Sequence, residues 1–186
     1  MDNLFVVIEN RFKEFYSDWE GGSQFRGSGE RLRRLVSEMC WSKKDIDREI
    51  DKNFKSVFKD PYSEMLVCKD INVWTLCPHH LLPCNFKVYI GYLPKKGKVL
   101  GLSKFARIAV TLAKKPIMQE QYTRELADVF QSRLEPDGLG IYVIGKHGCM
   151  GCRGINQELE VVTSKLEGAF LNDQMAREEF LSICRS

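Results

Sequence analysis

Two short segments that combine cysteine and histidine constrain the fold of this chain more than any other feature. Residues 77–80 read Cys-Pro-His-His, residues 147–152 read His-Gly-Cys-Met-Gly-Cys, and each segment directly follows a strand-like run. A thiolate and an imidazole at such a spacing can share a soft-to-borderline metal ion such as zinc. Because the segments lie far apart in the sequence, only folding can join them, and we expect the ends of two strands to meet there.

The counts of histidine and cysteine favour a metal site. A single pair would more often be a buried thiol beside a structural histidine, yet all three histidines of the chain, His79, His80 and His147, fall in these two segments. The seven cysteines are an odd number, which rules out a complete intramolecular disulfide set. Since the N-terminus shows no secretory signal pattern, we expect a reducing, cytoplasmic compartment, where grouped cysteines act as metal ligands or catalytic groups.

Length and charge exclude several other classes of protein. With 186 residues, of which 44% are hydrophobic and 28% charged, the chain has the profile of one soluble globular domain. No apolar run approaches the roughly 18 residues of a transmembrane helix, so we expect no membrane partner. The net charge of +3 is too small to argue for a nucleic-acid partner.

Hydrophobic periodicity predicts an α+β fold. We expect an N-terminal helical region over residues 1–60, with a glycine-rich linker at 21–29, helices at 30–40 and 43–54 and Ser42 as a helix N-cap. The core over 61–186 is expected to hold strands at 65–68, 71–76 and 87–93, helices at 103–115 and 119–134, strands at 139–146 and 158–165, and a final helix from about 173. This order predicts a mainly antiparallel sheet with two helices on one face.

A third constellation is the basic start of the first core helix. With Ser103 as the N-cap, Lys104 and Arg107 lie three residues apart on one face of the first turn. Free backbone N–H groups and the positive end of the helix dipole add to their charge, which favours a phosphate site. A solvated basic face is the simpler alternative, since residues 95–115 hold seven basic residues and no acidic one.

Two further features gain meaning only in a nucleotide pocket. Gln119 and Glu120 open the second core helix, where a carboxylate could merely balance the helix dipole. A glutamate can also accept hydrogen bonds from N1–H and the exocyclic amine of guanine. Arg153 follows the second cysteine segment, and it could either form a bidentate phosphate contact or be an ordinary surface arginine.

Several motifs, taken in order, resemble those of the GTP cyclohydrolase I family. They are Cys-x-His-His-Leu-x-Pro at 77–83, Ile-Gly-Tyr-Leu-Pro at 90–94, Val-Leu-Gly-Leu-Ser-Lys-x-x-Arg-Ile at 99–108, Gln-Glu at 119–120, His-x-Cys-Met-x-x-Arg-Gly at 147–154 and Val-Thr-Ser at 162–164. Each motif alone is weak, but their shared order over residues 73–185 makes the resemblance specific.

The resemblance implies a tunnelling fold (T-fold) that forms homodecamers of two stacked pentamers, with active sites between subunits. It implies that a zinc ion activates water for attack at C8 of GTP, that this carbon leaves as formate, and that the product is 7,8-dihydroneopterin triphosphate. Such a product can feed folate, tetrahydrobiopterin or deazaguanine synthesis.

By position, the resemblance also assigns roles to individual residues. The Zn²⁺ ligands would be Cys77, His80 and Cys149. His147 would be the catalytic acid/base, and His79 would lie near the reacting ring. The residues that recognise guanine would be Gln119 and Glu120, and those that hold the triphosphate would be Ser103, Lys104, Arg107 and Arg153.

The chain departs from the family pattern at two positions beside the metal. Pro78 stands where the family usually has glutamate, so a carboxylate that could orient a neighbouring group is absent. Cys152 could act as a fourth ligand and close a structural zinc site that leaves no position for water. A non-enzymatic nucleotide- or pterin-binding T-fold protein is therefore one alternative, and a cyclohydrolase for a different purine nucleotide is another. The remaining cysteines, Cys40, Cys68, Cys84 and Cys184, are expected to be ordinary core or surface thiols.

Overall fold

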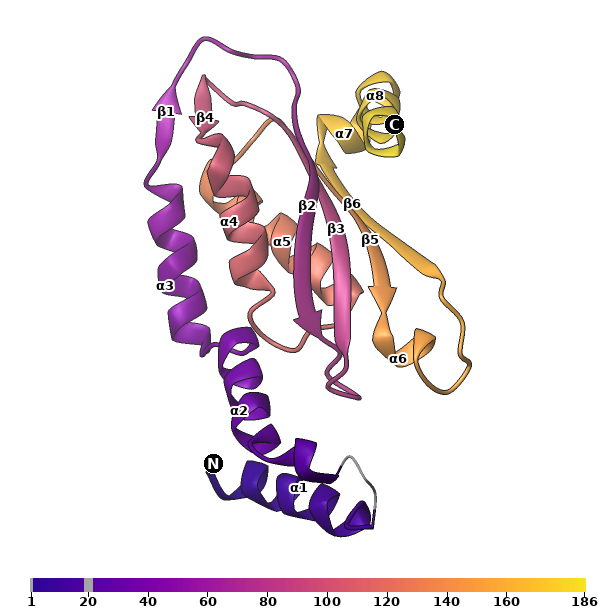
Figure 1. The fold of residues 1–186 in the computed structure, drawn as a ribbon. Coiled ribbons are helices and arrows are strands. Elements are labelled where there is room, and N and C mark those ends of the chain that lie inside the picture. Colours follow the sequence, from indigo (N-terminus) through magenta and orange to yellow (C-terminus); the bar gives the residue numbers. More distant parts are fainter. Residues whose placement is uncertain (1, 19–21) are drawn as a thin grey trace. The chain divides into compact units, whose positions relative to one another are not determined.

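The computed structural model describes residues 2–18 and 22–186, and the chain forms two compact units, residues 1–41 and 42–186 (Figure 1). The second unit contains both cysteine–histidine segments and the basic helix start, so it is the unit that positions the predicted site. Within the described residues, no helix is both long and apolar enough to cross a membrane.

The N-terminal unit is a pair of helices that hydrogen bonds to one carboxylate hold together. It consists of α1 (Asp2–Phe15), the short 3-10 helix η1 (Gly22–Phe25) and α2 (Ser28–Met39). Glu9 of α1 accepts hydrogen bonds from the backbone N–H groups of Gly27 (3.0 Å) and Gly29 (2.9 Å) at the start of α2, a helix end that attracts negative charge. Because α2 begins at Ser28, it occupies part of the predicted linker, of which residue 21 lies outside the described residues.

Four strands form the antiparallel sheet of the second unit. They are β2 (Leu66–Leu76), β3 (Pro83–Leu93), β5 (Gly138–His147) and β6 (Glu160–Gly168), in the spatial order β2-β3-β5-β6. The predicted strands at 65–68 and 71–76 are one strand with a bulge between Cys68 and Ile71, where Asp70 has a φ of 55°. In the described part of the chain, β2 and β6 each pair on one side only, so both edges of the sheet are open (Figure 1).

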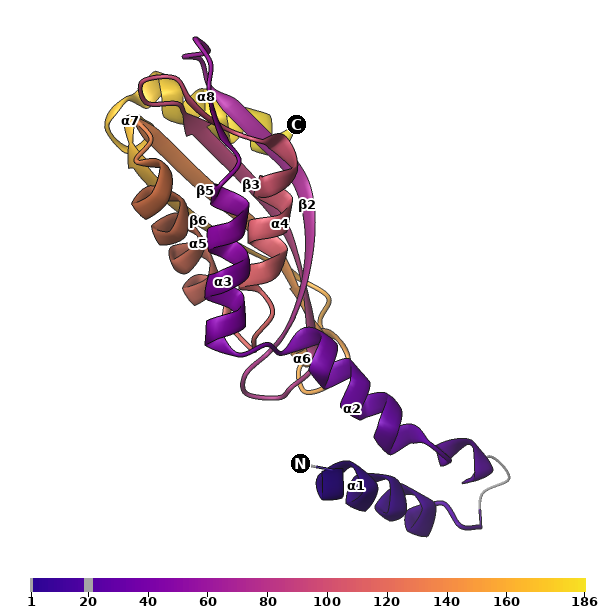
Figure 2. The same ribbon diagram turned by 90° about the vertical axis from the view of Figure 1, so that its left-hand side faces the viewer.

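Three helices lie on one side of this sheet and enclose the main core. α4 (Leu102–Leu112) and α5 (Gln119–Leu134) cover the face of the sheet, and α3 (Lys43–Phe54) packs on α4 (Figure 2). Ile50, Phe105 and Phe130 of these helices pack in one cluster with the strand residues Phe86 and Ile141. The unit therefore has the predicted order of strand, strand, helix, helix, strand, strand, and the α+β prediction is confirmed.

The start of α4 differs from its prediction. The helix begins at Leu102 with Gly101 as the N-cap, so Ser103 lies inside the first turn and is not the N-cap. The helix also ends at Leu112, three residues before the predicted end. A strand pair that the sequence did not predict, β1 (Val57–Lys59) with β4 (Lys98–Leu100), precedes it. The start of α4 is thus fixed by strand pairing and not by a polar cap.

The opposite face of the sheet is covered by α7 (Ala169–Asn172) and α8 (Gln174–Arg185), and α8 begins where Asp173 caps it. Phe180 of α8 is fully buried over Gly91 and Gly140, which are paired across β3 and β5. A Cβ at either glycine would lie 2.6 Å from the Phe180 ring, so the ring fits only because both positions lack a side chain.

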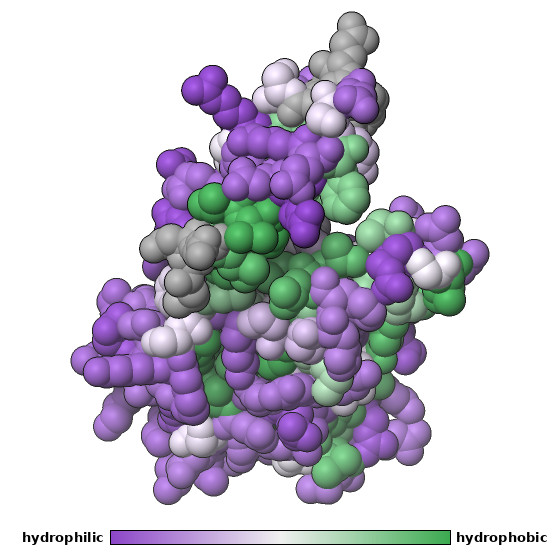
Figure 3. Space-filling model, turned by 90° about the horizontal axis from the view of Figure 1, so that it is seen from below, coloured by the Kyte–Doolittle hydropathy of each residue, from purple (hydrophilic) through white to green (hydrophobic). Residues whose placement is uncertain are grey.

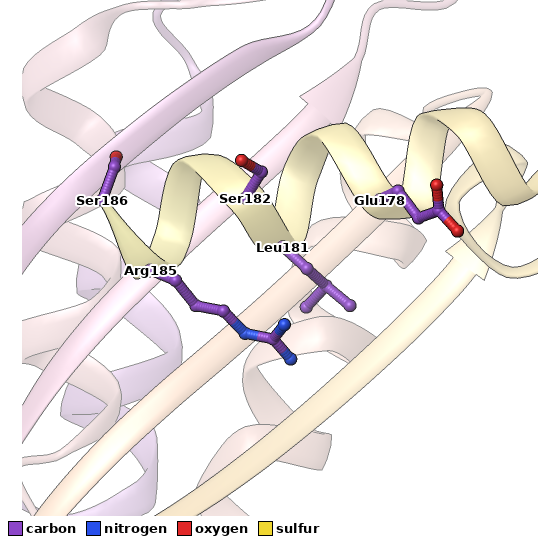
Figure 4. Close-up of a pocket in the computed structure, with 5 residues that line it drawn as sticks. All are labelled: Glu178, Leu181, Ser182, Arg185 and Ser186. Carbon is purple, nitrogen blue, oxygen red and sulfur yellow. The ribbon is translucent and has the colours of Figure 1, made fainter.

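The surface has exposed apolar regions and one open depression. On the face seen from below, apolar surface interrupts the hydrophilic residues (Figure 3). Large apolar side chains are also exposed on both outer strands, since Trp74 of β2 is 55% and Val162 of β6 is 51% exposed. An open depression lies along the C-terminal half of α8, and its lining residues are labelled in Figure 4. None of these lining residues belongs to the predicted site.

Candidate active site and metal centre

Two turns at one end of the sheet carry the cysteine–histidine segments. The first turn joins β2 to β3, and the hydrogen bond from Cys77 N–H to Leu82 O (2.9 Å) closes it. The second follows β5, where the short helix α6 (Gly148–Gly151) begins directly after His147. Because Cys84 lies opposite His147 in the β3–β5 pair, the start of β3 and the end of β5 meet here (Figure 1).

Cys77, His80 and Cys149 form a group able to hold a metal ion. Their ligand atoms all lie within 4.8 Å of one another, and Cys77 Sγ is 3.5 Å from His80 Nδ1. The structure thus brings together the three residues predicted as metal ligands. A set of two sulfurs and one imidazole nitrogen suits zinc and leaves the fourth tetrahedral position open for water or substrate.

The Cys77 thiol of this metal group opposes the ionisation of Cys149. Burial raises the pKa of Cys149, and the neighbouring Cys77 thiol raises it further. The charge of Arg153 acts in the opposite direction and lowers it. A cation between the two sulfurs removes the repulsion, because a coordinating thiol is deprotonated outright. The electrostatics of the group therefore favour a bound metal.

The other predicted residues at this end lie around the metal group. His79 is exposed, and its Nδ1 is 4.0 Å from Cys77 Sγ. Arg153 is exposed in the turn after α6. Cys152 is also exposed, and its thiol donates to Gly148 O at 2.8 Å. Among the described residues, Cys152 is not part of the metal group, so the geometry gives no support to a site closed by four protein ligands.

His147 lies between two buried side chains. Its Nε2 is 2.8 Å from Gln119 Oε1, and its Nδ1 is 3.3 Å from Cys84 Sγ. Burial lowers the pKa of His147, and the charge of Glu120 acts against this effect. The imidazole is therefore shifted towards its neutral form, in which one ring nitrogen is able to accept a proton.

Cys84 is a site residue that the sequence analysis missed. It is predicted to be an ordinary thiol, but it is 1% exposed and contacts His147. Burial, with Cys77 and Cys149 nearby, raises the pKa of Cys84 to about 12. The signal that could have found it is the strand register, because Cys84 stands directly opposite His147 once β3 and β5 are paired.

Gln119 ties the start of α5 to β5 and β6. The side chain is 1% exposed, and its Nε2 donates to Val161 O at 2.8 Å and lies 3.2 Å from Val143 O. Glu120, the next residue, is exposed and close enough to His147 to act on its pKa. Of the two residues predicted to recognise guanine, Glu120 is therefore open to solvent, whereas Gln119 is engaged inside the protein.

The predicted phosphate residues on α4 lie at the other end of the sheet. The start of α4 is tied to the end of β3, since Leu100 N–H donates to the Tyr92 hydroxyl at 3.2 Å. The chain after α4 returns to the metal end, where the Thr75 hydroxyl donates to Lys115 O at 2.7 Å. The residues concerned are Ser103, Lys104 and Arg107.

The length of the sheet separates these side chains from the metal group. In Figure 1, α4 begins beside β4 at the top, and α6 lies at the bottom end of the strands. From Cys84 to Tyr92, an extended strand is about 27 Å long. One chain therefore does not bring its α4 phosphate residues to its own metal group.

Comparison with known proteins identifies relatives over most of the chain. A family model described as GTP cyclohydrolase I matches residues 19–185. The GTP cyclohydrolase 1 of Hydrogenobaculum sp. (strain Y04AAS1) is 40% identical over 146 residues, which cover 78% of this chain and 79% of that protein. The GTP cyclohydrolase 1 of Pelotomaculum thermopropionicum is 34% identical over 161 residues, with 86% of this chain and 84% of that protein covered. The GTP cyclohydrolase 1 of Aquifex aeolicus is 40% identical over 157 residues, with 84% and 82% covered.

Proposed function

Because the chain belongs to the GTP cyclohydrolase I family, we propose that it hydrolyses GTP at C8, releases this carbon as formate and forms 7,8-dihydroneopterin triphosphate. The observation that carries the proposal is the metal group, with His147 held at the same end of the sheet. A metal centre near a titratable histidine combines the means to activate water with the means to move a proton at a purine nitrogen.

The proposed cofactor is Zn²⁺, held by Cys77, His80 and Cys149. A donor set of two sulfurs and one imidazole nitrogen supports this assignment, as does the raised pKa of Cys149, which a bound cation would offset. When bound, zinc supplies Lewis-acid activation of a water molecule at neutral pH. All seven cysteines of the chain are thiols in the structure, which suits a reducing compartment, and the cytoplasm is the proposed location.

His147 is the proposed acid/base. Its half-buried imidazole is able to exchange a proton with a purine nitrogen once the substrate takes the place of Gln119 Oε1 at Nε2. His79 is exposed beside Cys77, and we assign it to the neighbourhood of the reacting ring. Glu120 accepts hydrogen bonds from N1–H and the exocyclic amine of guanine in this arrangement. Gln119 contributes to recognition only where the substrate displaces one of its present partners.

The triphosphate requires a second copy of the chain. Arg153 lies at the metal end, but Ser103 and Lys104 lie in the first turn of α4 at the far end of the sheet, and Arg107 lies halfway along α4. A neighbouring copy that presents the start of its α4 to this metal group supplies the missing cations, and the helix N-terminus adds its backbone N–H groups. The active site is therefore proposed to lie between subunits.

The sheet offers the surfaces for such an assembly. β2 and β6 are outer strands with one unpaired side in the described residues, and both expose a large apolar side chain, Trp74 and Val162. Unpaired strand edges are templates for pairing with another chain. Pairing of the β2 edge of one copy with the β6 edge of the next gives a closed ring where the rotation between copies closes. The proposed homo-oligomer is the decamer of two stacked pentamers that the family resemblance implies.

Incubation of the zinc-loaded protein with GTP tests the proposed function. We expect stoichiometric formate and a product that mass spectrometry identifies as 7,8-dihydroneopterin triphosphate, which gives a fluorescent neopterin after oxidation. The chelator-treated protein is the matched control and should be inactive until zinc is restored. Intact GTP with the zinc-loaded protein, or turnover that survives removal of zinc, would contradict the proposal.

A variant separates the role of His147 from that of the metal. His147→Ala should keep its zinc and its fold and lose turnover by on the order of 100-fold or more, the usual contribution of a general acid/base. Zinc content by atomic absorption and secondary structure by circular dichroism check the first two points. Turnover close to that of the unmodified protein would show that another group moves the proton.

A further inference from the structure

The side-chain amide of Gln119 has a fixed orientation. One end of this amide lies 2.8 Å from Val161 O and 3.2 Å from Val143 O. Backbone carbonyl oxygens only accept hydrogen bonds, so the atom that faces them must be the amide nitrogen. The amide oxygen therefore faces His147, and no exchange of the two ends satisfies all of these neighbours.

This orientation determines which nitrogen of His147 carries a proton. Gln119 Oε1 lies 2.8 Å from His147 Nε2, and an amide oxygen has no hydrogen to donate. Nε2 is therefore the N–H group. In a neutral imidazole the other nitrogen is then a bare acceptor, so Nδ1 requires a donor if it is to be satisfied in this half-buried position.

The donor at Nδ1 is the thiol of Cys84. Its Sγ lies 3.3 Å from Nδ1, and Cys84 is 1% exposed, so water has little access to compete for this bond. Cys84 also lies outside the metal group formed by the described residues, and the other acceptor near its thiol, Leu82 O, is farther away, at 3.9 Å. We propose that Cys84 is a positioning residue, whose S–H group and the Gln119 carbonyl together hold His147 as the Nε2–H tautomer in one ring orientation.

The proposal rests on the proposed function in one respect, the assignment of His147 as the acid/base. A rotation of the imidazole by half a turn would place carbon atoms against both hydrogen-bonding partners. Of the two ring orientations that fill the same space, the partners therefore select one. Gly145 makes room for this arrangement, because a Cβ there would collide with Gln119 Oε1 and lie 3.1 Å from His147 Nε2. Cys84 on β3, Gly145 on β5 and Gln119 on α5 thus together fix the proton of His147 on Nε2.

Neutron diffraction from deuterium-exchanged crystals of the full-length protein tests the proton positions directly. We expect a deuteron on His147 Nε2, none on Nδ1, and one on Cys84 Sγ that points at Nδ1. A deuteron on Nδ1 together with a bare Nε2 would overturn the proposal. This measurement involves no turnover, so it stands whether or not the protein hydrolyses GTP.

Three variants test the consequence for catalysis. Cys84→Ala removes the donor and should lower kcat by about tenfold with KM for GTP and zinc content unchanged. Cys84→Ser keeps a donor at the same position and should recover most of the loss, which a purely space-filling role would not predict. Cys184→Ala removes another buried thiol, on α8, and should leave kcat unchanged. Equal kcat values for Cys84→Ala and the unmodified protein would overturn the positioning role, whereas absence of GTP turnover in the unmodified protein would instead remove the proposed function.

Discussion

The two ends of the four-stranded sheet in residues 42–186 are built in different ways. At the end with the metal group, side chains from two turns and from the start of α5 meet, and His147 forms hydrogen bonds with Cys84 and with Gln119 inside the protein. At the other end, the start of α4 presents Ser103 and Arg107 to solvent. At the first end, the side chains form hydrogen bonds with other groups of the same chain, whereas at the second end a charged side chain faces solvent.

Under the proposed function, this difference would divide the steps of one reaction between the two ends of a single chain. Binding a metal and positioning a histidine require fixed geometry, which strand pairing and burial provide. Binding a flexible triphosphate requires positive charge and helix-end N–H groups, which work well at an exposed helix start. Under the proposed function, a chain with these functions at opposite ends would complete a site only with a neighbour, and the following variants test this proposal.

The largest effect is expected from loss of a metal ligand. Cys149→Ala should remove zinc and lower turnover by at least about 10⁴-fold, since the activated water is lost with the metal. Zinc content and formate release measure the two effects. Cys152→Ser is the matched control, because this exposed thiol lies outside the metal group, and it should keep both. Loss of zinc from the control would restore the four-ligand alternative.

The stability of the sheet that joins the two ends should depend on the packing of α8 against it. Phe180→Ala should lower the free energy of unfolding by about 3–5 kcal/mol, because it empties the space over Gly91 and Gly140. Urea unfolding measures the change. Met175→Ala on the same helix removes a side chain that is 81% exposed, and it should change the stability by less than about 0.5 kcal/mol. Equal stabilities for the two variants would show that α8 does not support the sheet.

The α4 end should affect binding of the substrate and leave the metal in place. Arg107→Ala should lower kcat/KM for GTP by about 10- to 100-fold, the cost of a lost hydrogen bond between charged groups, with zinc content unchanged. Lys44→Ala on α3 removes an exposed lysine outside the proposed site, and it should have no effect on kcat/KM.

Co-expression of two defective chains tests whether the ends meet between subunits. When Cys149→Ala and Arg107→Ala chains assemble together at equal levels, about a quarter of the sites should receive an intact metal group from one copy and an intact Arg107 from another. The mixture should then turn over GTP faster than the average of the two separate proteins. A mixture no more active than that average would place both functions within one subunit.

The smallest effect concerns the connection from α4 to α5 at the metal end. Burial raises the pKa of Glu125, but hydrogen bonds from Lys115 (2.6 Å) and Gln121 (2.7 Å) outweigh it and hold the pKa below the ordinary value. A carboxyl with a lowered pKa stabilises the folded state above its unfolded pKa, and this contribution is lost as the pH falls through the folded value. Glu125→Gln should therefore lower the free energy of unfolding by up to about 1 kcal/mol at neutral pH. The difference should shrink below about pH 4.3, as urea unfolding at a series of pH values would show.

The elements with strong local signals could be predicted from the sequence. α3 begins after the predicted cap at Ser42, and α5 has the predicted bounds, because caps and periodicity are encoded in neighbouring residues. The residues of the metal group could be recognised because cysteine and histidine at close spacing are rare and chemically specific. Their meeting could be expected only from the strands that precede them.

The features that depend on distant residues could not be predicted. The bond between Cys84 and His147 follows from the register of β3 against β5, which no local pattern specifies. Ser103 resembles a helix cap in the sequence, but β4 pairs with β1, and the N-cap of α4 is Gly101, two residues earlier. The separation of the metal end from the α4 end is likewise a property of the topology, since motifs give residue types and not directions.

The open edges of the sheet have a consequence for the newly made chain. Until they are covered, β2 and β6 expose 11- and 9-residue strands whose outward N–H and C=O groups are able to pair with any extended segment. When the β2 edge of one copy pairs with the β6 edge of the next, the assembly is finite only if the rotation between copies closes a ring. With any other rotation, copies add without limit and form a filament. In the proposed assembly, the twist of the sheet therefore determines whether the copies form a closed ring or a filament. Substitutions that alter the twist should impair assembly even when they lie far from the metal group.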